Sequence, residues 1–230
     1  MNSQLDDELK QINNLKWLPW IGQDYFDLKG DERILIVGES HYQDDSNVSI
    51  EKHKDPEFTR RVVKELGVDK YYEKVQLFKN LHLALLGTDT FEGKLLWDKV
   101  CFYNFIQRPM DTNKGRPSKE DLIGGWQVFE ELIKKIKPRY CLFVGTSSTA
   151  SYLSGMSNST LKHSKLYPDG WVNDTASMHA TIEHPDGFET DLYFIRHASN
   201  FFSWKQWNEH LDKRMGHVLR KFLSSEDAIS

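Results

Sequence analysis

Four short runs of apolar residues recur along the chain, and each is followed at once by glycine or polar residues. The runs cover residues 33–38, 99–104, 139–145 and 192–197. An uninterrupted apolar run of this length is typical of a β-strand that is buried on both faces of a sheet. We therefore predict four core strands at these positions.

Segments with helical periodicity lie between and after these runs. Residues 117–136 begin with Pro-Ser and then place apolar side chains every three or four positions, which predicts an amphipathic helix. Residues 56–66, 147–153 and 204–222 also fit helices. Alternating strands and helices favour a parallel sheet with helices on both faces. We expect a single three-layer α/β/α domain with a central, mostly parallel four-stranded sheet.

Two segments depart from this rhythm. Residues 1–32 carry seven Asp and Glu against three Lys, and we expect them to form an acidic N-terminal extension. Residues 155–187 are rich in Ser, Asn, Asp and Gly, which indicates a long insertion with one extra strand at 177–183. Insertions of this size often shape a substrate pocket. With 230 residues, 39% of them hydrophobic, the chain suits one domain over residues 1–230.

Composition says more about where the protein resides than about what it does. The net charge of −4 disfavours binding of nucleic acid by bulk electrostatics, although residues 196–221 carry six Lys and Arg against two acids. That stretch is either a local basic surface or an ordinary solvated helix face. No signal peptide or membrane span is recognisable, and Cys101 and Cys141 lie inside apolar runs as expected of buried free thiols. We expect a cytoplasmic monomer with no membrane partner.

Polar residues follow each predicted strand at its carboxyl end, where open parallel sheets bind their ligands. The first strand is followed by Glu39, Ser40, His41 and Tyr42, and the second ends at Asn104. The third is followed by residues 145–147 and the fourth by residues 197–200. These groups are therefore expected to meet at one edge of the sheet.

These clusters, in this order, resemble the uracil-DNA glycosylases over roughly residues 33–204. Residues 38–42 (GESHY) are similar to the water-activating loop, which reads G-Q-D-P-Y in the first family and G-E-A-P-G in the iron–sulfur family. Residues 104–109 and 113–120 resemble N-x-x-x-C-R-P-P and N-R-x-P-x-x-x-E of the iron–sulfur family, and residues 137–145 its k-P-x-x-x-x-x-x-G strand. Residues 197–199 (HAS) stand where the superfamily has H-P-S. The resemblance implies the fold of that superfamily and cleavage of the N-glycosidic bond of a flipped-out base in DNA.

The sequence also departs from those families. Two cysteines cannot supply the four thiolates of the cluster, so neither an iron–sulfur centre nor another cofactor is expected. Ser40 stands where the first family has its catalytic Asp, and His41 and Ala198 replace two prolines. The histidines show no compact metal-binding spacing, so we expect no metal.

The chemistry assigns roles to three residues. Glycosidic cleavage builds positive charge on the sugar and negative charge on the departing base. Glu39 is the carboxylate of the first loop and would orient water or stabilise the cation, unless it only caps a helix or forms a salt bridge. A neutral His197 would donate to the base O2, although a lone histidine is more often structural. The Asn104 amide suits the edge of a pyrimidine, with a turn-forming Asn as the alternative.

The remaining candidates surround these three. We expect Gly38, Ser40, His41, Tyr42, Phe58 and Ser199 to bind substrate, with the Tyr42 ring crowding the base C5 position and Phe58 or His53 stacking on the base. We expect Ser147, Asn200, Phe201, Phe202 and Lys205 to contact DNA. Ser147 opens a helix whose backbone N–H groups suit phosphate, and one of the two phenylalanines would fill the gap left by the flipped base. In an extended segment one of these two rings should be buried and the other exposed.

The leading hypothesis is a monofunctional DNA glycosylase that acts on uracil or a modified pyrimidine with water and without a lysine Schiff base. A second enzyme hypothesis is a phage-defence enzyme that excises hypermodified cytosine, because the replaced Asp, the replaced prolines and the insertion indicate a reshaped pocket. The alternative from another class is a non-catalytic DNA- or nucleotide-binding protein of the same fold, which Ser40 and the acidic charge favour and Glu39, Asn104 and His197 disfavour.

Overall fold

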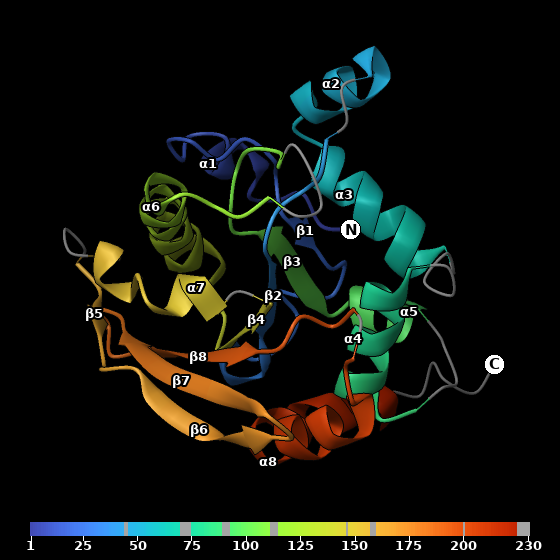
Figure 1. Cartoon of the computed structure of the whole chain (residues 1–230), viewed down its shortest axis with the longest axis vertical. Coiled ribbons are helices and arrows are strands. Elements are labelled where there is room, and N and C mark those ends of the chain that lie inside the picture. Colours follow the sequence, from blue (N-terminus) through green and yellow to red (C-terminus); the bar gives the residue numbers. More distant parts are fainter. Residues whose placement is uncertain are drawn as a thin grey trace.

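A large mixed sheet with helices on both faces forms the body of the molecule (Figure 1). The structure, a computed structural model, describes residues 1–43, 46–69, 75–88, 93–110, 115–145, 147–156, 160–199 and 201–224, without the side chains of residues 147 and 148. In chain order the elements are α1 (Asp6–Leu9), β1 (Trp20–Ile21), β2 (Ile34–Gly38), α2 (Asn47–Lys54), α3 (Phe58–Val63), a π-helical segment (Lys64–Val68), α4 (Gln76–Leu86), α5 (Gly93–Trp97), β3 (Val100–Asn104), α6 (Lys119–Ile136), β4 (Tyr140–Val144), α7 (Ser147–Ala150), β5 (Lys162–His163), β6 (Tyr167–Val172), β7 (Thr175–Glu183), β8 (Glu189–Ile195) and α8 (Trp204–Ser224).

The centre of the sheet consists of the four predicted core strands. They lie in the order β3-β2-β4-β8, and every neighbouring pair among them is parallel. The register places Gly38 opposite Asn104 and Val144 opposite Ile195, so the carboxyl ends of the four strands share one edge. The four core strands are thus confirmed, and so is the mostly parallel centre.

The predicted number of strands is wrong, because the described residues form an eight-stranded sheet. β1 pairs antiparallel with β3, β7 pairs antiparallel with β8, and β5 and β6 both pair with β7. The insertion therefore holds three strands where one was expected. β6 contains Pro168 and Gly170 and shifts its register between them, and such residues in a strand are typical of edges and bulges. The residue pattern of β6 consequently resembles that of a loop.

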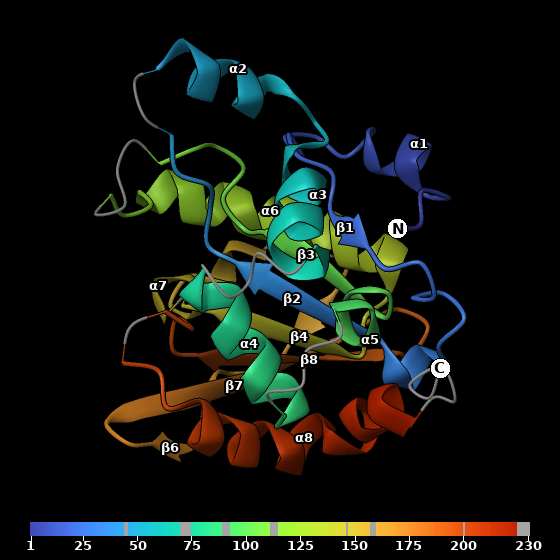
Figure 2. The same cartoon turned by 90° about the vertical axis from the view of Figure 1, so that its right-hand side faces the viewer.

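Two hydrophobic layers cover the two faces of the sheet. Successive side chains of a strand point to opposite faces, so Leu35 and Val37 pack with α6 whereas Ile34 and Ile36 pack with α4 and α8. We call these the α6 face and the α8 face. Figure 2 shows α4 in front of the central strands, with α8 running below α4. The predicted helices at 117–136 and 204–222 correspond to α6 and α8.

The N-terminal segment, expected as an acidic extension, packs into the core. Leu9, Ile12 and Leu18 belong to the layer on the α6 face, and Trp17 is only 1% exposed. Cys101 and Cys141 are buried free thiols, as predicted. Among the residues that the structure describes, no helix has both the length and the apolar character needed to cross a membrane.

The connections of the central strands open a crevice at the carboxyl edge. After β2 the chain passes to α3 and α4 on the α8 face, whereas after β4 it passes to α7 on the α6 face. Neighbouring strands whose connections diverge in this way leave room for a ligand between their ends.

Candidate functional site

A pocket of about 310 Å³ lies at this carboxyl edge. That volume falls at the small end of the range of ligand sites. Polar groups from the loops that follow β2, β3 and β8 line one part of it, and apolar side chains from α3, the π-helical segment, α4 and the core strands line the rest. The lining is Gly38, Glu39, Ser40, His41, Tyr42, Asn104 and His197, with Val62, Leu66, Val75, Leu77, Phe78, Leu81, Phe102 and Val144. The structure thus brings seven of the predicted site residues into one pocket.

Two glycines at strand ends make room for the functional side chains. A Cβ on Gly38 would clash with the Asn104 side-chain oxygen, and a Cβ on Gly145 would clash with the His197 ring. Gly145 also has a φ of +79°, in the left-handed region that favours glycine. The side chains of Asn104 and His197 therefore lie across the ends of the neighbouring strands, which places both beside the pocket.

The loops after β2 and β3 extend the sheet beyond its strands. Backbone hydrogen bonds join Phe105 N to Gly38 O (2.9 Å), Ile106 N to Glu39 O (2.8 Å) and Met110 N to His41 O (2.8 Å). The Ser40 hydroxyl adds a 2.6 Å hydrogen bond to the carbonyl of Arg108. These contacts fix the loop that carries Glu39 against the loop that carries Asn104.

Glu39 is a partly buried carboxyl in a largely apolar pocket. Burial raises its pKa above the usual glutamate value, and the charge of Arg116 opposes this rise. The charge of Arg116 also helps to lower the pKa of His197, and it opposes the rise in the pKa of Tyr42. Sequence reasoning did not single out Arg116, which is an exposed residue preceding α6. A carboxylate of raised pKa beside a cation is a combination found at functional sites.

His197 is held in a neutral form by its surroundings. Burial, followed by the charge of Arg116, lowers its pKa. Its Nδ1 lies 2.8 Å from the hydroxyl of Ser199. If that hydroxyl donates to Nδ1, the imidazole proton resides on Nε2, and His197 then has a donor available for a ligand.

The loop that carries His197 is anchored by a residue that the sequence did not reveal. Asn80 on α4 is 5% exposed, and its Nδ2 donates to the carbonyls of Ala198 (3.0 Å) and Ser199 (2.9 Å). Gln76 donates in turn to Asn80 Oδ1 at 2.7 Å. The helical spacing of Leu77, Phe78 and Leu81 is visible in the sequence and would have predicted α4, though not this contact.

Asn104 has its own anchor. Its side chain is 4% exposed, and its carbonyl accepts a 2.6 Å hydrogen bond from Gln107 Nε2. Gln107 Oε1 accepts from the backbone N–H groups of Lys16 (2.9 Å) and Trp17 (3.0 Å). One glutamine therefore ties the Asn104 loop to the N-terminal segment, which is a further role that no local sequence pattern indicates.

Three other predicted residues of the first loop differ in what they do. The Ser40 hydroxyl donates to the Arg108 carbonyl, so it holds the backbone of the two loops together. His41 Nε2 lies 2.8 Å from the Thr59 hydroxyl, and burial lowers the pKa of His41 to about 3. Tyr42 is 45% exposed at the pocket, and burial and the neighbouring Glu39 raise its pKa. Of the three, Tyr42 has the side chain best placed to meet a ligand.

Phe58 lies apart from the pocket. Its ring centroid is 4.6 Å from that of His41 and 4.5 Å from that of His53. Trp17 closes the same cluster, 4.9 Å from His41. This cluster supports the first loop from behind, and the structure does not bring Phe58 or His53 into the pocket lining.

Of the predicted DNA-contacting residues, the structure describes the side chains of Phe201, Phe202 and Lys205, and none of these three lines the pocket. Phe201 is 88% exposed with a φ of +56°, whereas Phe202 is 8% exposed and stacks on Trp207 with centroids 5.8 Å apart. The predicted split between one buried and one exposed ring is confirmed, but Phe201 lies in a turn with left-handed backbone and not in the extended segment on which the prediction was based. Lys205 is exposed on α8. Asn200, Asn113, Thr146 and the side chain of Ser147 lie outside the described residues.

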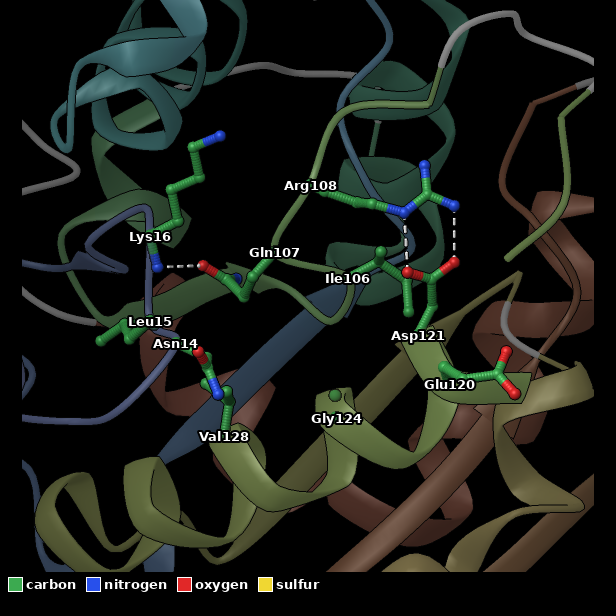
Figure 3. A pocket seen from close by; sticks show the side chains of 11 residues that line it. Asn14, Leu15, Lys16, Ile106, Gln107, Arg108, Glu120, Asp121, Gly124 and Val128 are labelled. Carbon is green, nitrogen blue, oxygen red and sulfur yellow. Dashed lines mark hydrogen bonds and ion pairs between the residues drawn. The ribbon is translucent and has the colours of Figure 1, made fainter. Parts of the chain in front are cut away.

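A second cavity, of about 380 Å³, lies behind the Asn104 loop, between α6 and the N-terminal segment (Figure 3). Arg108 faces Asp121 there in a two-pronged ion pair with bonds of 2.7 and 2.6 Å, and Gln107 points to the Lys16 backbone. The side chains of Arg108, Asp121 and Gln107 are thus engaged with the protein itself. Within the part of the chain that the structure describes, no group of three metal-ligating side chains gathers.

Fold and pocket together define an α/β protein with a small pocket at the carboxyl edge of the parallel centre of its sheet. No protein-family model matches the chain, and no curated protein matches its sequence. A proposal about function therefore has to rest on the geometry of the pocket and on its chemistry.

Proposed function

We propose that the protein is a monofunctional DNA glycosylase of the uracil-DNA glycosylase superfamily, acting on uracil or a modified pyrimidine. The observation that carries this proposal is the convergence of Glu39, Asn104 and His197, from three parallel strands, on one largely apolar pocket. A carboxylate, an amide and a neutral imidazole are the groups that this reaction uses.

Each group has a defined task in the proposed reaction. The Asn104 amide recognises the edge of the base with its donor and acceptor. As the bond between C1′ and the base nitrogen breaks, its electron pair leaves with the base, and His197 stabilises the growing charge on a base oxygen. Glu39 stabilises the cationic sugar and orients the water whose oxygen bonds to C1′, and the water's surplus proton passes to Glu39 or to solvent. Among the described residues that line the pocket there is no lysine, which supports water as the nucleophile.

Two exposed side chains fit the DNA-binding part of the proposal. Phe201 holds a large ring in solvent on left-handed backbone, a conformation that costs about 1–2 kcal/mol and that is concentrated at functional sites. An exposed ring beside the His197 loop suits the gap that a flipped base leaves in the duplex. Lys205 suits a phosphate contact.

The direct test is incubation with uracil-containing single- and double-stranded oligonucleotides and with DNA that bears bulky modified cytosines. We expect abasic sites, revealed by alkaline strand cleavage, from at least one of these substrates. The matched control is Glu39→Gln, which keeps the side-chain shape and removes the charge. Failure of the wild-type protein to produce abasic sites from any of them, while it binds the same DNA, would reject the catalytic proposal.

The biological role within this proposal is a separate question. A phage-defence enzyme that excises hypermodified cytosine would reduce plaque counts of phages with modified cytosine and spare phages with ordinary cytosine. A uracil repair enzyme would protect against neither. Plaque assays with both kinds of phage therefore separate the two enzyme hypotheses.

One observation favours a non-catalytic binding protein as the second candidate. Ser40 occupies the position of the catalytic Asp in the first family, and its hydroxyl is bonded to the Arg108 carbonyl, so it supplies neither charge nor a base. Tight binding to DNA with an abasic site, without turnover of any base, would be the signature of this second function.

A further inference from the structure

The hairpin of β6 and β7 is fastened at several points beside the candidate pocket. Asn173 in its turn donates a 3.0 Å hydrogen bond to the Ser203 hydroxyl, in the loop that also holds Phe201. Asp174 forms a 3.1 Å ion pair with Arg196, just before His197. Farther along β6, Asp169 forms a 3.0 Å ion pair with Arg214 on α8. Figure 2 shows the hairpin turn on the same side of the molecule as the end of β2.

A further pocket, of about 260 Å³, lies between this hairpin and α7. β7 contributes Thr175, Ala176 and Met178, and the end of β8 contributes Phe194 and Ile195. His197 lines this pocket as well as the candidate active pocket. The two pockets are therefore neighbours, with the His197 side chain between them.

Trp171 lies on β6, next to the residue Ala176 that lines this adjoining pocket. Its side chain is 71% exposed, and its backbone is paired with Ala176 of the lining. Paired residues of antiparallel strands project to the same face of a sheet, so Trp171 lies on the α6 face beside the pocket. A tryptophan is costly to leave in water and is enriched where proteins bind partners.

Arg196 supplies a cation at the same place. Its Nη1 donates to Asp174 (3.1 Å) and to the Thr175 hydroxyl (3.3 Å), and the residue lines the adjoining pocket. These bonds fix the guanidinium, which carries donors on its other two nitrogens as well. The register places this guanidinium just after β8 and the exposed Trp171 ring on β6, the two strands that flank β7, and together they match the two parts of a nucleotide, the phosphate and the base.

We infer that the β6–β7 hairpin is a stacking platform for single-stranded DNA that leads to the candidate pocket past His197. A base next to the flipped nucleotide stacks on Trp171, and its phosphate meets Arg196. Single-stranded DNA is the occupant because an unpaired base offers a free face to a ring, whereas bases inside a duplex already stack on each other. This inference rests on the proposed function, since it takes DNA as the ligand.

The test measures binding of a fluorescein-labelled strand of fifteen thymidines, a length of about fifteen nucleotides that suits such platforms, by fluorescence anisotropy at low salt. Trp171→Ala should weaken binding roughly 5- to 100-fold, the scale of one base–aromatic stack, and Trp171→Phe should restore most of it. Tyr167→Ala is the matched control, because Tyr167 is exposed on the same strand but is paired with His179, on the α8 face. It should bind like the wild type.

Several outcomes would overturn the platform. They are absence of binding by the wild-type protein, equal binding by Trp171→Ala and wild type, and an equal loss in Tyr167→Ala. A Trp171-dependent loss that appears only with a fully paired duplex would also overturn it, in favour of a duplex contact. Because the thymidine strand contains no uracil, its binding does not depend on cleavage. A protein that cleaves no base but shows the Trp171 dependence keeps the platform and loses the glycosylase assignment.

Discussion

At the scale of single residues, the electrostatic environment of Glu39 links the proposed chemistry to pH. Glu39 acts as an anion, and its pKa is raised by burial. Activity should therefore fall as pH decreases through this raised pKa, at a higher pH than for an ordinary glutamate. Burial and the charge of Arg116 lower the pKa of His197, so protonation of its imidazole is shifted toward more acidic pH. Single-turnover rates measured against pH test this: an acidic limb that persists unchanged in Glu39→Gln would contradict the assignment.

Substitutions of the same two residues test their catalytic role. Glu39→Gln and His197→Ala should each raise the barrier of the chemical step by roughly 2–4 kcal/mol, as when one transition-state contact is removed. DNA binding should change much less. The folded pKa of Glu39 is raised, so its charged form opposes folding above that pKa. Glu39→Gln should consequently be no less stable than the wild type at neutral pH. Wild-type single-turnover rates in both variants would refute these roles.

His41 makes a separate prediction about stability. Its folded pKa is about 3, against about 6.5 in an unfolded chain. Between these values the unfolded state binds a proton and the folded state does not, so stability falls as pH decreases from 6.5 toward 3. The slope from this residue approaches about 1.4 kcal/mol per pH unit.

The matched variant is His41→Gln, which places a side-chain amide near Thr59 in place of the imidazole and does not titrate. Denaturant unfolding of both proteins across this pH range should give curves that diverge toward low pH, with the wild type losing more. Parallel curves would mean that folding does not lower the pKa of His41.

Single-residue patterns predicted the polar edge because the residues that follow apolar strands are visible in the chain. They did not predict Asn80, Gln107 or the backbone role of Ser40. Each of those depends on a contact with a partner distant in sequence. Ala198, for example, lies 118 positions after Asn80. Asn, Gln and Ser occur on most surfaces, so their type and spacing carry no sign of such anchoring.

At the scale of elements, the core strands and α6 were predictable because burial dictates their composition. β2 and β4 are buried along their whole length, and only continuous apolar runs satisfy that. β6 is mostly exposed or partly exposed and gains its place by pairing with β7, which leaves little constraint on its residues. Edge strands therefore escape a search for apolar runs, and the described residues form a sheet of eight strands where four were expected.

The loop after β8 carries the element-scale prediction. Phe201→Ala removes an exposed ring and should leave stability nearly unchanged, whereas Phe202→Ala removes a ring stacked on Trp207 and should cost roughly 3–5 kcal/mol. If Phe201 fills the gap left by a flipped base, activity on double-stranded DNA should fall more than activity on single strands, since an unpaired base is cheaper to extrude by a few kcal/mol. Equal losses on both substrates would leave Phe201 without the wedge role.

At the scale of the whole molecule, segments far apart in the chain assemble one site. The N-terminal segment supplies Trp17, which packs on His41 in the first loop and donates through its backbone to Gln107. Gln107 in turn holds the carbonyl of Asn104. Residues 16–17, 38–42 and 104–107 are thereby joined behind the pocket. The segment predicted as an extension thus supports two of the loops on which the proposed function depends.

This linkage predicts a change in selectivity rather than a simple loss of stability. Gln107→Glu keeps an acceptor for the Lys16 and Trp17 N–H groups but presents oxygen, which cannot donate, to the Asn104 carbonyl. Asn104 should shift, and a misplacement of about 1 Å costs on the order of 100-fold in rate. The loss should be largest for the preferred base, so the ratio of its kcat/KM to that of a poorer base should fall.

Arg108→Ala provides the control for that experiment, because Arg108 belongs to the same loop but pairs with Asp121 on α6 and does not hold Asn104. Figure 3 shows the two side chains extending in different directions from this loop. Both variants lose polar contacts of the loop, so both should be somewhat less stable. A neutral hydrogen bond such as that of Gln107 is worth about 0.5–1.5 kcal/mol. Only Gln107→Glu should alter the preference between bases. Matching changes in base preference would show that the loop responds as a whole and that Gln107 has no special hold on Asn104.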